Sequence, residues 1–248
     1  MRALFDLATA YEPTDDERRA RVPPVAAVLL DFSNTLFHMV DARTWLARVA
    51  AASGRDLDVD PGLDVVLADV AAAAERPDVV AAQQGRDLSD AAHRDAMRAW
   101  FSHVPGLAGA EDVAVDVLRA PDAWVPYPDA AEVLEALAAR DVPVGVVSDI
   151  GWDIRVHAQH AGLEHLVGSW TLSCELGAEK PDPAVFAAAC RSLGVDPRAT
   201  LMVGDNPVRD SGAVTVGCRA FVLPAEHRSG ERGLRAVLDL VGAPVGAR

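Results

Sequence analysis

The sequence has few cysteines, a single lysine and no long apolar run. Its cysteines, Cys174, Cys190 and Cys218, are odd in number and irregularly spaced, which argues against a disulfide framework or a zinc ribbon and favours reduced thiols. No segment approaches the roughly 18 consecutive apolar residues that a membrane-spanning helix needs. The first residues are soon followed by charged ones, unlike a signal peptide. We therefore expect a soluble, cytoplasmic protein.

Positive charge is also scarce, because 37 acidic residues outnumber 23 lysines and arginines and give a formal net charge of −14. Such a charge repels nucleic acids and anionic membranes, so we expect neither as a partner. A small anionic substrate is still compatible with this net negative charge if the binding site itself is locally positive. The length of 248 residues suits one large domain, or a domain with an insert. The sequence does not indicate the oligomeric state.

Lys180 is the only lysine in a chain that otherwise uses arginine. The general bias towards arginine is mostly genomic. Chance alone can leave one lysine, but an isolated lysine also suggests a position that favours a compact ammonium group, since the two cations differ in shape and hydration.

The residue pattern divides the chain into three parts. Residues 1–24 form a polar N-terminal extension, with a short amphipathic helix over residues 2–11, and end at two prolines. Residues 38–124 show helical periodicity without a clear strand pattern, with helix caps expected at Asp41, Asp60 and Ser89, and they predict a helical cap inserted after the first strand. The flanking segments, 25–37 and 125–248, form the core.

Apolar, strand-like runs alternate with helical segments in this core. The runs cover residues 25–30, 142–147, 169–173, 200–203 and 218–223, and the main helices between them cover residues 129–140, 153–161 and 183–193. Alternating β and α units imply a parallel sheet with helices on both faces. The expected fold class is therefore α/β, a doubly wound parallel sheet with an inserted α-helical cap.

Polar residues stand at or just beyond the ends of these strands, where open parallel sheets form their ligand crevice. They are Asp31 with Ser33 and Thr35, Ser148, Lys180, and Asp205 with Asp210. Each alone is compatible with a helix cap or a turn. Their joint occurrence, with the only lysine among them, indicates an active site.

The four motifs resemble those of the haloacid dehalogenase-like superfamily of aspartate-nucleophile phosphotransferases. The matching segments are residues 31–36 (DFSNTL), 146–148 (VVS), 179–183 (EKPDP) and 204–210 (GDNPVRD). The resemblance covers the core at about residues 25–37 and 125–224. The insert matches the helical cap of that superfamily in position and helical character only.

The resemblance implies a Mg²⁺-dependent hydrolase for a small phosphorylated substrate. Asp31 would attack phosphorus and become an aspartyl phosphate, with Lys180 and Ser148 binding the phosphoryl group. The metal ligands it implies are Asp31, the backbone carbonyl of Ser33, Asp205 and, through water or through Lys180, Asp210.

Ser33 departs from the family pattern, because most phosphatases of the family have a second aspartate there, which protonates the leaving group and then activates water. A serine hydroxyl does not serve as a carboxylate base at neutral pH, and loss of such a group costs on the order of 10² to 10⁴ in rate. The candidate substitutes are His38, Asp149 and Asp153. Asn34 replaces the usual glycine, and asparagine tolerates a left-handed backbone better than most residues.

Other members of the superfamily carry different residues at the position of Ser33. Metal-free dehalogenases have an aromatic residue, phosphonate-cleaving members have alanine, and ion-pumping ATPases have threonine. Phosphonate cleavage requires a cap lysine, which this cap lacks, and a metal ligand at Asp205 argues against a carbon-halogen hydrolase. A catalytically degenerate module that binds a phosphorylated ligand or a protein is the principal alternative.

Polar residues of the cap are candidate substrate contacts, although a solvated helix face fits most of them better. They are Gln83, Gln84, Arg86, His93, Arg94, Arg98 and His103. The aromatic residues Trp45, Trp100 and Phe101 fit the core of the cap better than a stacking surface for substrate.

Overall fold

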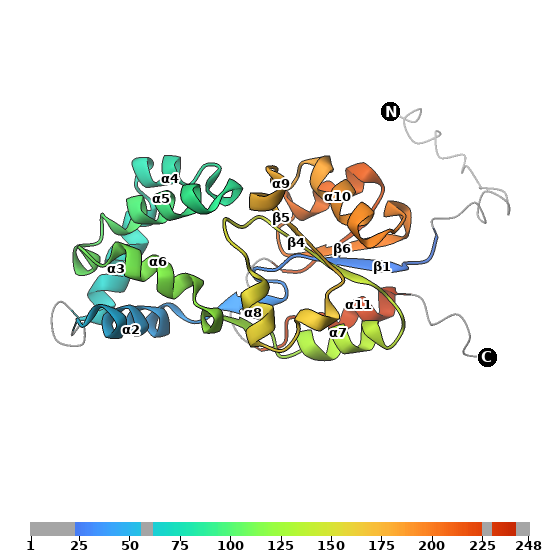
Figure 1. The fold of residues 1–248 in the computed structure, drawn as a ribbon, viewed down its shortest axis with the longest axis horizontal. Coiled ribbons are helices and arrows are strands. Elements are labelled where there is room, and N and C mark those ends of the chain that lie inside the picture. The colour runs from blue at the N-terminus through green and yellow to red at the C-terminus, as the bar shows by residue number, and fades with distance from the viewer. Residues whose placement is uncertain (1–22, 56–61, 225–229, 242–248) are drawn as a thin grey trace, which may run out of the picture.

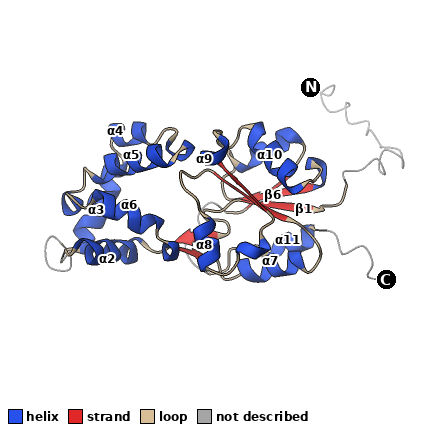
Figure 2. Ribbon diagram, viewed as in Figure 1, coloured by secondary structure: helices blue, strands red, loops and turns tan. Residues whose placement is uncertain are grey.

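A computed structural model describes residues 23–55, 62–224 and 230–241, and its centre is a sheet of five parallel strands (Figures 1 and 2). In chain order these strands are β1 (Ala27–Leu30), β4 (Val144–Ser148), β5 (Ser169–Leu172), β6 (Thr200–Gly204) and β7 (Arg219–Val222). The predicted fold class, an α/β protein with a doubly wound parallel sheet, is confirmed. Nearly all of the predicted N-terminal extension, and the helix cap at Asp60, lie outside the described residues.

The spatial order of the strands is β5-β4-β1-β6-β7, so the chain builds the sheet outward from β1 on one side and then crosses to the other. Alternate residues of β1 pack on opposite faces of the sheet. Val28 and Leu30 belong to one buried cluster, and Leu29 belongs to another. This period of two in an apolar strand is what a sheet covered on both faces requires.

Helices cover both faces, as Figure 1 shows. One face carries α7 (Ala130–Ala138), α8 (Arg155–His160) and α11 (Arg235–Leu240), and the other carries α9 (Ser173–Leu176), α10 (Pro183–Leu193) and the 3₁₀ helix η6 (Asp210–Val216). Helix α10 begins and ends at the predicted residues. None of the helices in the described part of the chain is long and apolar enough to cross a membrane.

A separate helical block lies beside the sheet and has its own buried cluster (Figure 2). Its helices are α2 (Ala42–Ser53), α3 (Leu63–Ala74), α4 (Pro77–Ala82), α5 (Asp90–Phe101) and α6 (Glu111–Arg119). Asp41 and Ser89 cap α2 and α5 as predicted, because their side chains accept hydrogen bonds from backbone N–H groups of the first turns. Trp45 and Phe101 are buried in this cluster, as expected of core residues.

Two short antiparallel strands join the block to the sheet. They are β2 (Phe37–Met39) and β3 (Trp124–Pro126), with His38 opposite Val125. The predicted cap boundaries, 38 and 124, therefore fall inside these strands. Runs of three residues gave no recognisable alternation in the sequence, which is why this pair was not predicted.

The helical block docks onto the core close to the ends of the strands. The ring of Trp152, in the loop after β4, lies 4.6 Å from the ring of His93 in α5. A Cβ atom on Gly151 would lie 2.4 Å from the Cβ of His93, so only glycine permits this approach. The hydroxyl of Ser173 also donates a hydrogen bond of 2.5 Å to the carbonyl of Asp87 in the 3₁₀ helix η1 (Arg86–Leu88). These contacts hold residues of the block above the strand ends.

Asp129 ties two distant segments of the core together. Its buried carboxylate accepts hydrogen bonds from the backbone N–H groups of Arg232, Gly233 and Leu234, at 2.7 to 2.8 Å. One side chain therefore joins the start of α7 to the start of α11.

We expect Asp129→Ala to lower the free energy of unfolding by about 2 to 4 kcal/mol, because two buried donors and one partly buried donor lose a charged acceptor. Asp182→Ala, which removes an exposed cap from α10, is the matched control and should cost about 1 kcal/mol. Urea unfolding measures both values. Equal losses in the two variants would contradict the role assigned to Asp129.

Candidate active site

Four of the predicted site residues meet at the carboxyl ends of the central strands. Asp31 follows β1, Ser148 ends β4, and Asp205 follows β6, while Lys180 lies in the loop before α10. All four line one pocket with a volume of about 760 Å³. The other residues that line it are Ser33, Asn34, Val80, Gln83, Gln84, Gly85, Arg86, Asp87, Asp149, Glu179, Asn206 and Arg209.

Lys180 occupies the centre of the charged network. Its Nζ donates hydrogen bonds of 2.7 Å to Oδ1 of Asp31 and of 2.7 Å to Oδ1 of Asp210. Its backbone N–H donates to Oδ1 of Asp149 at 2.8 Å. The residue is 5% exposed, so the ammonium is fixed by these partners rather than by water.

The sequence around Asp210 explains how its carboxylate reaches the lysine. A Cβ atom at position 204 would lie 2.0 Å from Oδ2 of Asp210, so Gly204 is required for this close approach. The same Oδ2 accepts a hydrogen bond of 2.9 Å from the backbone N–H of Asn206. Both oxygens of Asp210 are therefore engaged, one by the loop and one by Lys180.

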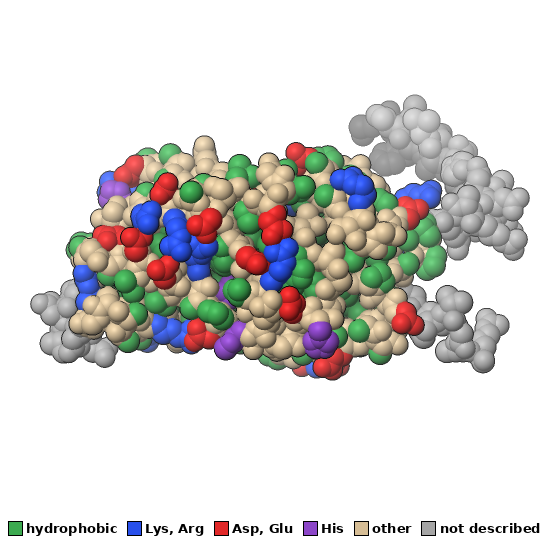
Figure 3. All heavy atoms as spheres, in the orientation of Figure 1, with side chains coloured by type: hydrophobic (Ala, Val, Ile, Leu, Met, Phe, Trp, Pro, Cys, Tyr) green, Lys and Arg blue, Asp and Glu red, His purple; other side chains and the backbone are tan. Residues whose placement is uncertain are grey.

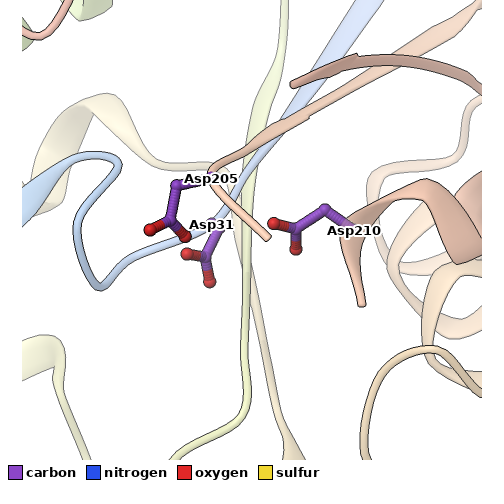
Figure 4. Close-up of side chains that lie close together, drawn as sticks. All are labelled: Asp31, Asp205 and Asp210. Carbon is purple, nitrogen blue, oxygen red and sulfur yellow. The ribbon is translucent and has the colours of Figure 1, made fainter. Parts of the chain in front are cut away.

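Three carboxylates cluster beside this ammonium, which is hydrogen-bonded to two of them, Asp31 and Asp210. Asp31, Asp205 and Asp210 each offer an oxygen atom within 4.8 Å of the others, and Figure 4 shows the carboxylate of Asp210 directed towards Asp31. Burial raises the pKa of Asp31 to about 6, and the charges of Asp210 and Asp205 add to the rise, although Lys180 opposes it. The pKa of Asp205 is raised by burial and by Asp210.

The pKa of Lys180 is also raised: burial alone would lower it, but the carboxylates of Asp31 and Asp210 outweigh that effect. The site therefore holds more negative charge than its own cation neutralises. Closely spaced carboxylate oxygens with an excess of negative charge suit a hard divalent cation such as Mg²⁺. The donor set present in the structure thus fits the metal that the sequence predicts, while the Ser33 carbonyl remains a predicted ligand.

The loop after Asp31 adopts the expected backbone. Asn34 has a φ of 56°, the left-handed conformation for which asparagine is suited. Thr35 donates a hydrogen bond of 3.3 Å to Oδ2 of Asp31, so its hydroxyl supports the carboxylate. Ser33 is half-buried and lines the pocket, close to the predicted nucleophile.

The three proposed substitutes for the missing acid differ in whether they line the pocket. Asp149 lines the pocket, but its carboxylate is bonded to the backbone of Lys180 and, at 2.5 Å, to Arg209. His38 packs its ring against Tyr127, and Asp153 pairs with Arg155. Neither His38 nor Asp153 lines the pocket.

Of the predicted cap contacts, Gln83, Gln84 and Arg86 line the pocket. Arg94 and Arg98 instead form ion pairs with Asp116 and Asp112 on the surface of the block. Acidic and basic side chains lie next to one another on the face drawn in Figure 3, as such pairing requires. The other two predicted contacts, His93 and His103, also lie outside the pocket lining: His93 is buried against Trp152, and His103 pairs with Asp78.

Sequence reasoning did not single out Asp87, Glu179 or Arg209 as site residues. Glu179 and Arg209 directly precede Lys180 and Asp210, so their positions beside the motifs were a usable signal. Asp87 gave no such signal, because only the docking of the helical block brings it to the pocket.

A profile of haloacid dehalogenase-like hydrolases matches residues 25–214. The chain belongs to this family. It is therefore a hydrolase, as predicted.

Individual relatives of this hydrolase include both phosphatases and a dehalogenase. A phosphoserine phosphatase from Thermus thermophilus is 35% identical over 111 residues, which are 44% of this chain and 42% of the relative. An (S)-2-haloacid dehalogenase from Burkholderia cepacia is 30% identical over 131 residues, or 52% and 54%. The hydrolase thus spans about half the length of these relatives.

Solved structures support the fold. The crystal structure of a phosphatase of this family from Thermococcus onnurineus matches 88% of this hydrolase and 98% of its own chain, with a TM-score of 0.55 and 19% identity. A likeness at this identity establishes the fold alone.

The raised pKa of Asp31 has a consequence for stability. The folded protein holds this proton more tightly than the unfolded chain, whose aspartate titrates at 3.8. Stability of the metal-free hydrolase should therefore fall as the pH rises from about 4 to about 6, and remain lower above that range. We expect the free energy of unfolding of Asp31→Asn at pH 7 to exceed that of the wild type by on the order of 2 kcal/mol.

Urea unfolding in EDTA between about pH 4 and pH 7 measures this difference, which should disappear near the acidic end. A difference that stays constant across the range would contradict the raised pKa of Asp31.

Proposed function

We propose that the hydrolase is a Mg²⁺-dependent phosphatase or phosphotransferase that acts on a small phosphorylated metabolite through an aspartyl phosphate. The observation that carries this proposal is Lys180, whose ammonium bridges Asp31 and Asp210 at 2.7 Å beside Asp205. A nucleophilic carboxylate with an adjacent cation and a set of metal ligands is what phosphoryl transfer needs.

The chain's own residues would divide the reaction as follows. Asp31 attacks phosphorus, and the ammonium of Lys180 neutralises charge on the nucleophile and the phosphoryl oxygens. The hydroxyl of Ser148 donates a hydrogen bond to one of those oxygens, and Thr35 keeps the Asp31 carboxylate oriented. When bound to Asp31, Asp205 and the Ser33 carbonyl, Mg²⁺ supplies the positive charge that lets an anionic substrate approach. Asp210 acts through Lys180, because both of its oxygens are already hydrogen-bonded.

The pocket supports a small and polar substrate. Val80 is the only large apolar residue among the described residues that line it, and the volume of about 760 Å³ suits a metabolite rather than a macromolecule. The net charge of −14 supports the same choice over nucleic acids and anionic membranes. Three free cysteines fit a cytoplasmic location.

Carbon-halogen hydrolysis is the second candidate, and the Burkholderia relative favours it. The three clustered carboxylates argue against it, because they would repel the carboxylate of a haloacid unless a metal neutralised them. Release of chloride from 2-chloropropionate without Mg²⁺ would support this second candidate over phosphoryl transfer.

Beryllium fluoride with Mg²⁺ mimics an aspartyl phosphate and tests the proposal. We expect the pair to raise the melting temperature of the wild type, with on the order of 2.7 kcal/mol of stabilisation at about 100 times the dissociation constant. Asp31→Asn and Asp205→Asn should not respond. Asp112→Asn, which removes an exposed carboxylate from α6, is the matched control and should respond as the wild type does.

A response that needs no Mg²⁺, or one that persists in Asp31→Asn, would overturn the proposed function.

A further inference from the structure

The pocket contains few groups able to carry a proton between a leaving group and water. Among the described residues that line it there is no histidine, cysteine or tyrosine, and Ser33 stands where the family usually has an acid. The lining carboxylates are Asp31, Asp87, Asp149, Glu179 and Asp205. Asp31 and Asp205 belong to the nucleophile and metal cluster, and Asp149 is held by Lys180 and Arg209. Two carboxylates remain, Asp87 and Glu179.

The position of Asp87 distinguishes it from Glu179. Phosphoryl transfer proceeds in line, so the leaving group departs on the side of phosphorus opposite to Asp31. Asp31 approaches from the strand ends, and the wall that faces them belongs to the helical block, which contributes Asp87. Glu179 instead belongs to the core loop, directly before Lys180.

Asp87 is held in place by the docking of the block. Its carbonyl accepts the hydrogen bond of 2.5 Å from Ser173, at the start of α9, which fixes η1 against the core. Its side chain is 11% exposed and its carboxylate lies 3.4 Å from Nε of Arg86. The same Nε donates a hydrogen bond of 3.5 Å to Oδ2 of Asp87, so both contacts are longer than a strong charge-assisted hydrogen bond.

The surroundings of Asp87 favour the protonated carboxyl more than the surroundings of an exposed aspartate do. Burial raises its pKa, and the negative charge of Asp149 adds to the rise, although Arg86 and Arg209 oppose it. A raised pKa makes a carboxyl a more available proton donor than an ordinary aspartate.

We propose that Asp87 is the proton carrier that replaces the missing acid at Ser33, a role that rests on the proposed function. In the first step the oxygen of Asp31 bonds to phosphorus, the bond from phosphorus to the leaving oxygen breaks, and the carboxyl proton of Asp87 passes to that oxygen. The products are a free alcohol, the aspartyl phosphate and the Asp87 carboxylate.

In the second step the Asp87 carboxylate takes a proton from a water molecule as the water oxygen attacks phosphorus. The bond between phosphorus and Asp31 breaks, which returns the Asp31 carboxylate, protonated Asp87 and inorganic phosphate. A residue of the helical block thereby completes a set whose other reacting groups, Asp31, Ser148 and Lys180, come from the core, and only the docked arrangement is competent for alkyl esters.

Two phosphate esters that differ in leaving group test this role. Glycerol 2-phosphate releases a strongly basic alkoxide that needs a proton, whereas p-nitrophenyl phosphate releases a weakly basic phenolate that does not. With Mg²⁺ present, Asp87→Asn should lower kcat/KM for glycerol 2-phosphate by about 10² to 10⁴. The same variant should lower kcat/KM for p-nitrophenyl phosphate by less than about tenfold, and adding Ser33→Asp should restore hydrolysis of the alkyl ester.

Two further variants distinguish proton transfer by Asp87 from proton transfer by Glu179 and from a general effect of charge on the helical block. Glu179→Gln removes the competing carboxylate and should change kcat/KM for both esters by the same factor. Asp112→Asn, on the outer surface of the same block, should leave both unchanged. Equal losses on the two esters in Asp87→Asn, or the selective loss in Glu179→Gln instead, would overturn the role of Asp87. If the wild type hydrolysed neither ester, that result would instead overturn the proposed function.

Discussion

The ammonium of Lys180, buried between the carboxylates of Asp31 and Asp210, is the interaction on which the site depends. A buried charge is costly unless it is paired and hydrogen-bonded, so the fold must bring all three side chains into contact. The parallel sheet makes this possible, because β1 and β6 lie side by side and present Asp31 and the loop before Asp210 at the same edge. Gly204 permits the last approach, since any side chain there would collide with Asp210.

The same interaction leaves the metal-free site incompletely neutralised. Three carboxylates cluster beside one ammonium, and burial, together with the charges of Asp210 and Asp205, raises the pKa of Asp31. Such an arrangement lowers stability in exchange for a site that attracts a divalent cation and an anionic substrate, a frequent conflict between stability and activity. The helical block adds a second requirement, because Gly151 and Trp152 must accept His93 before η1 can face the strand ends.

The core could be predicted from the sequence because its signals are local. Apolar runs that end in polar residues located Asp31, Ser148 and Asp205, and the isolated lysine marked Lys180. The pair β2 and β3 could not be predicted, because three-residue strands carry too little pattern. Nor could Asp87, whose place in the pocket depends on the contact of His93 with Trp152 and on the hydrogen bond from Ser173 to Asp87, which join distant parts of the chain. Arg94 and Arg98 were candidate substrate contacts for which a solvated helix face fitted better, and acidic residues do pair with them at the surface.

Covalent phosphorylation of Asp31 is the central claim, and rapid acid quenching tests it most directly. The hydrolase would be mixed with Mg²⁺ and acetyl phosphate labelled with ³²P, quenched in acid within one turnover, and digested for peptide mapping. The account predicts acid-stable, hydroxylamine-sensitive label on the peptide that contains Asp31, and none in Asp31→Asn. Release of labelled phosphate without protein-bound label, or label that survives in Asp31→Asn, would contradict it.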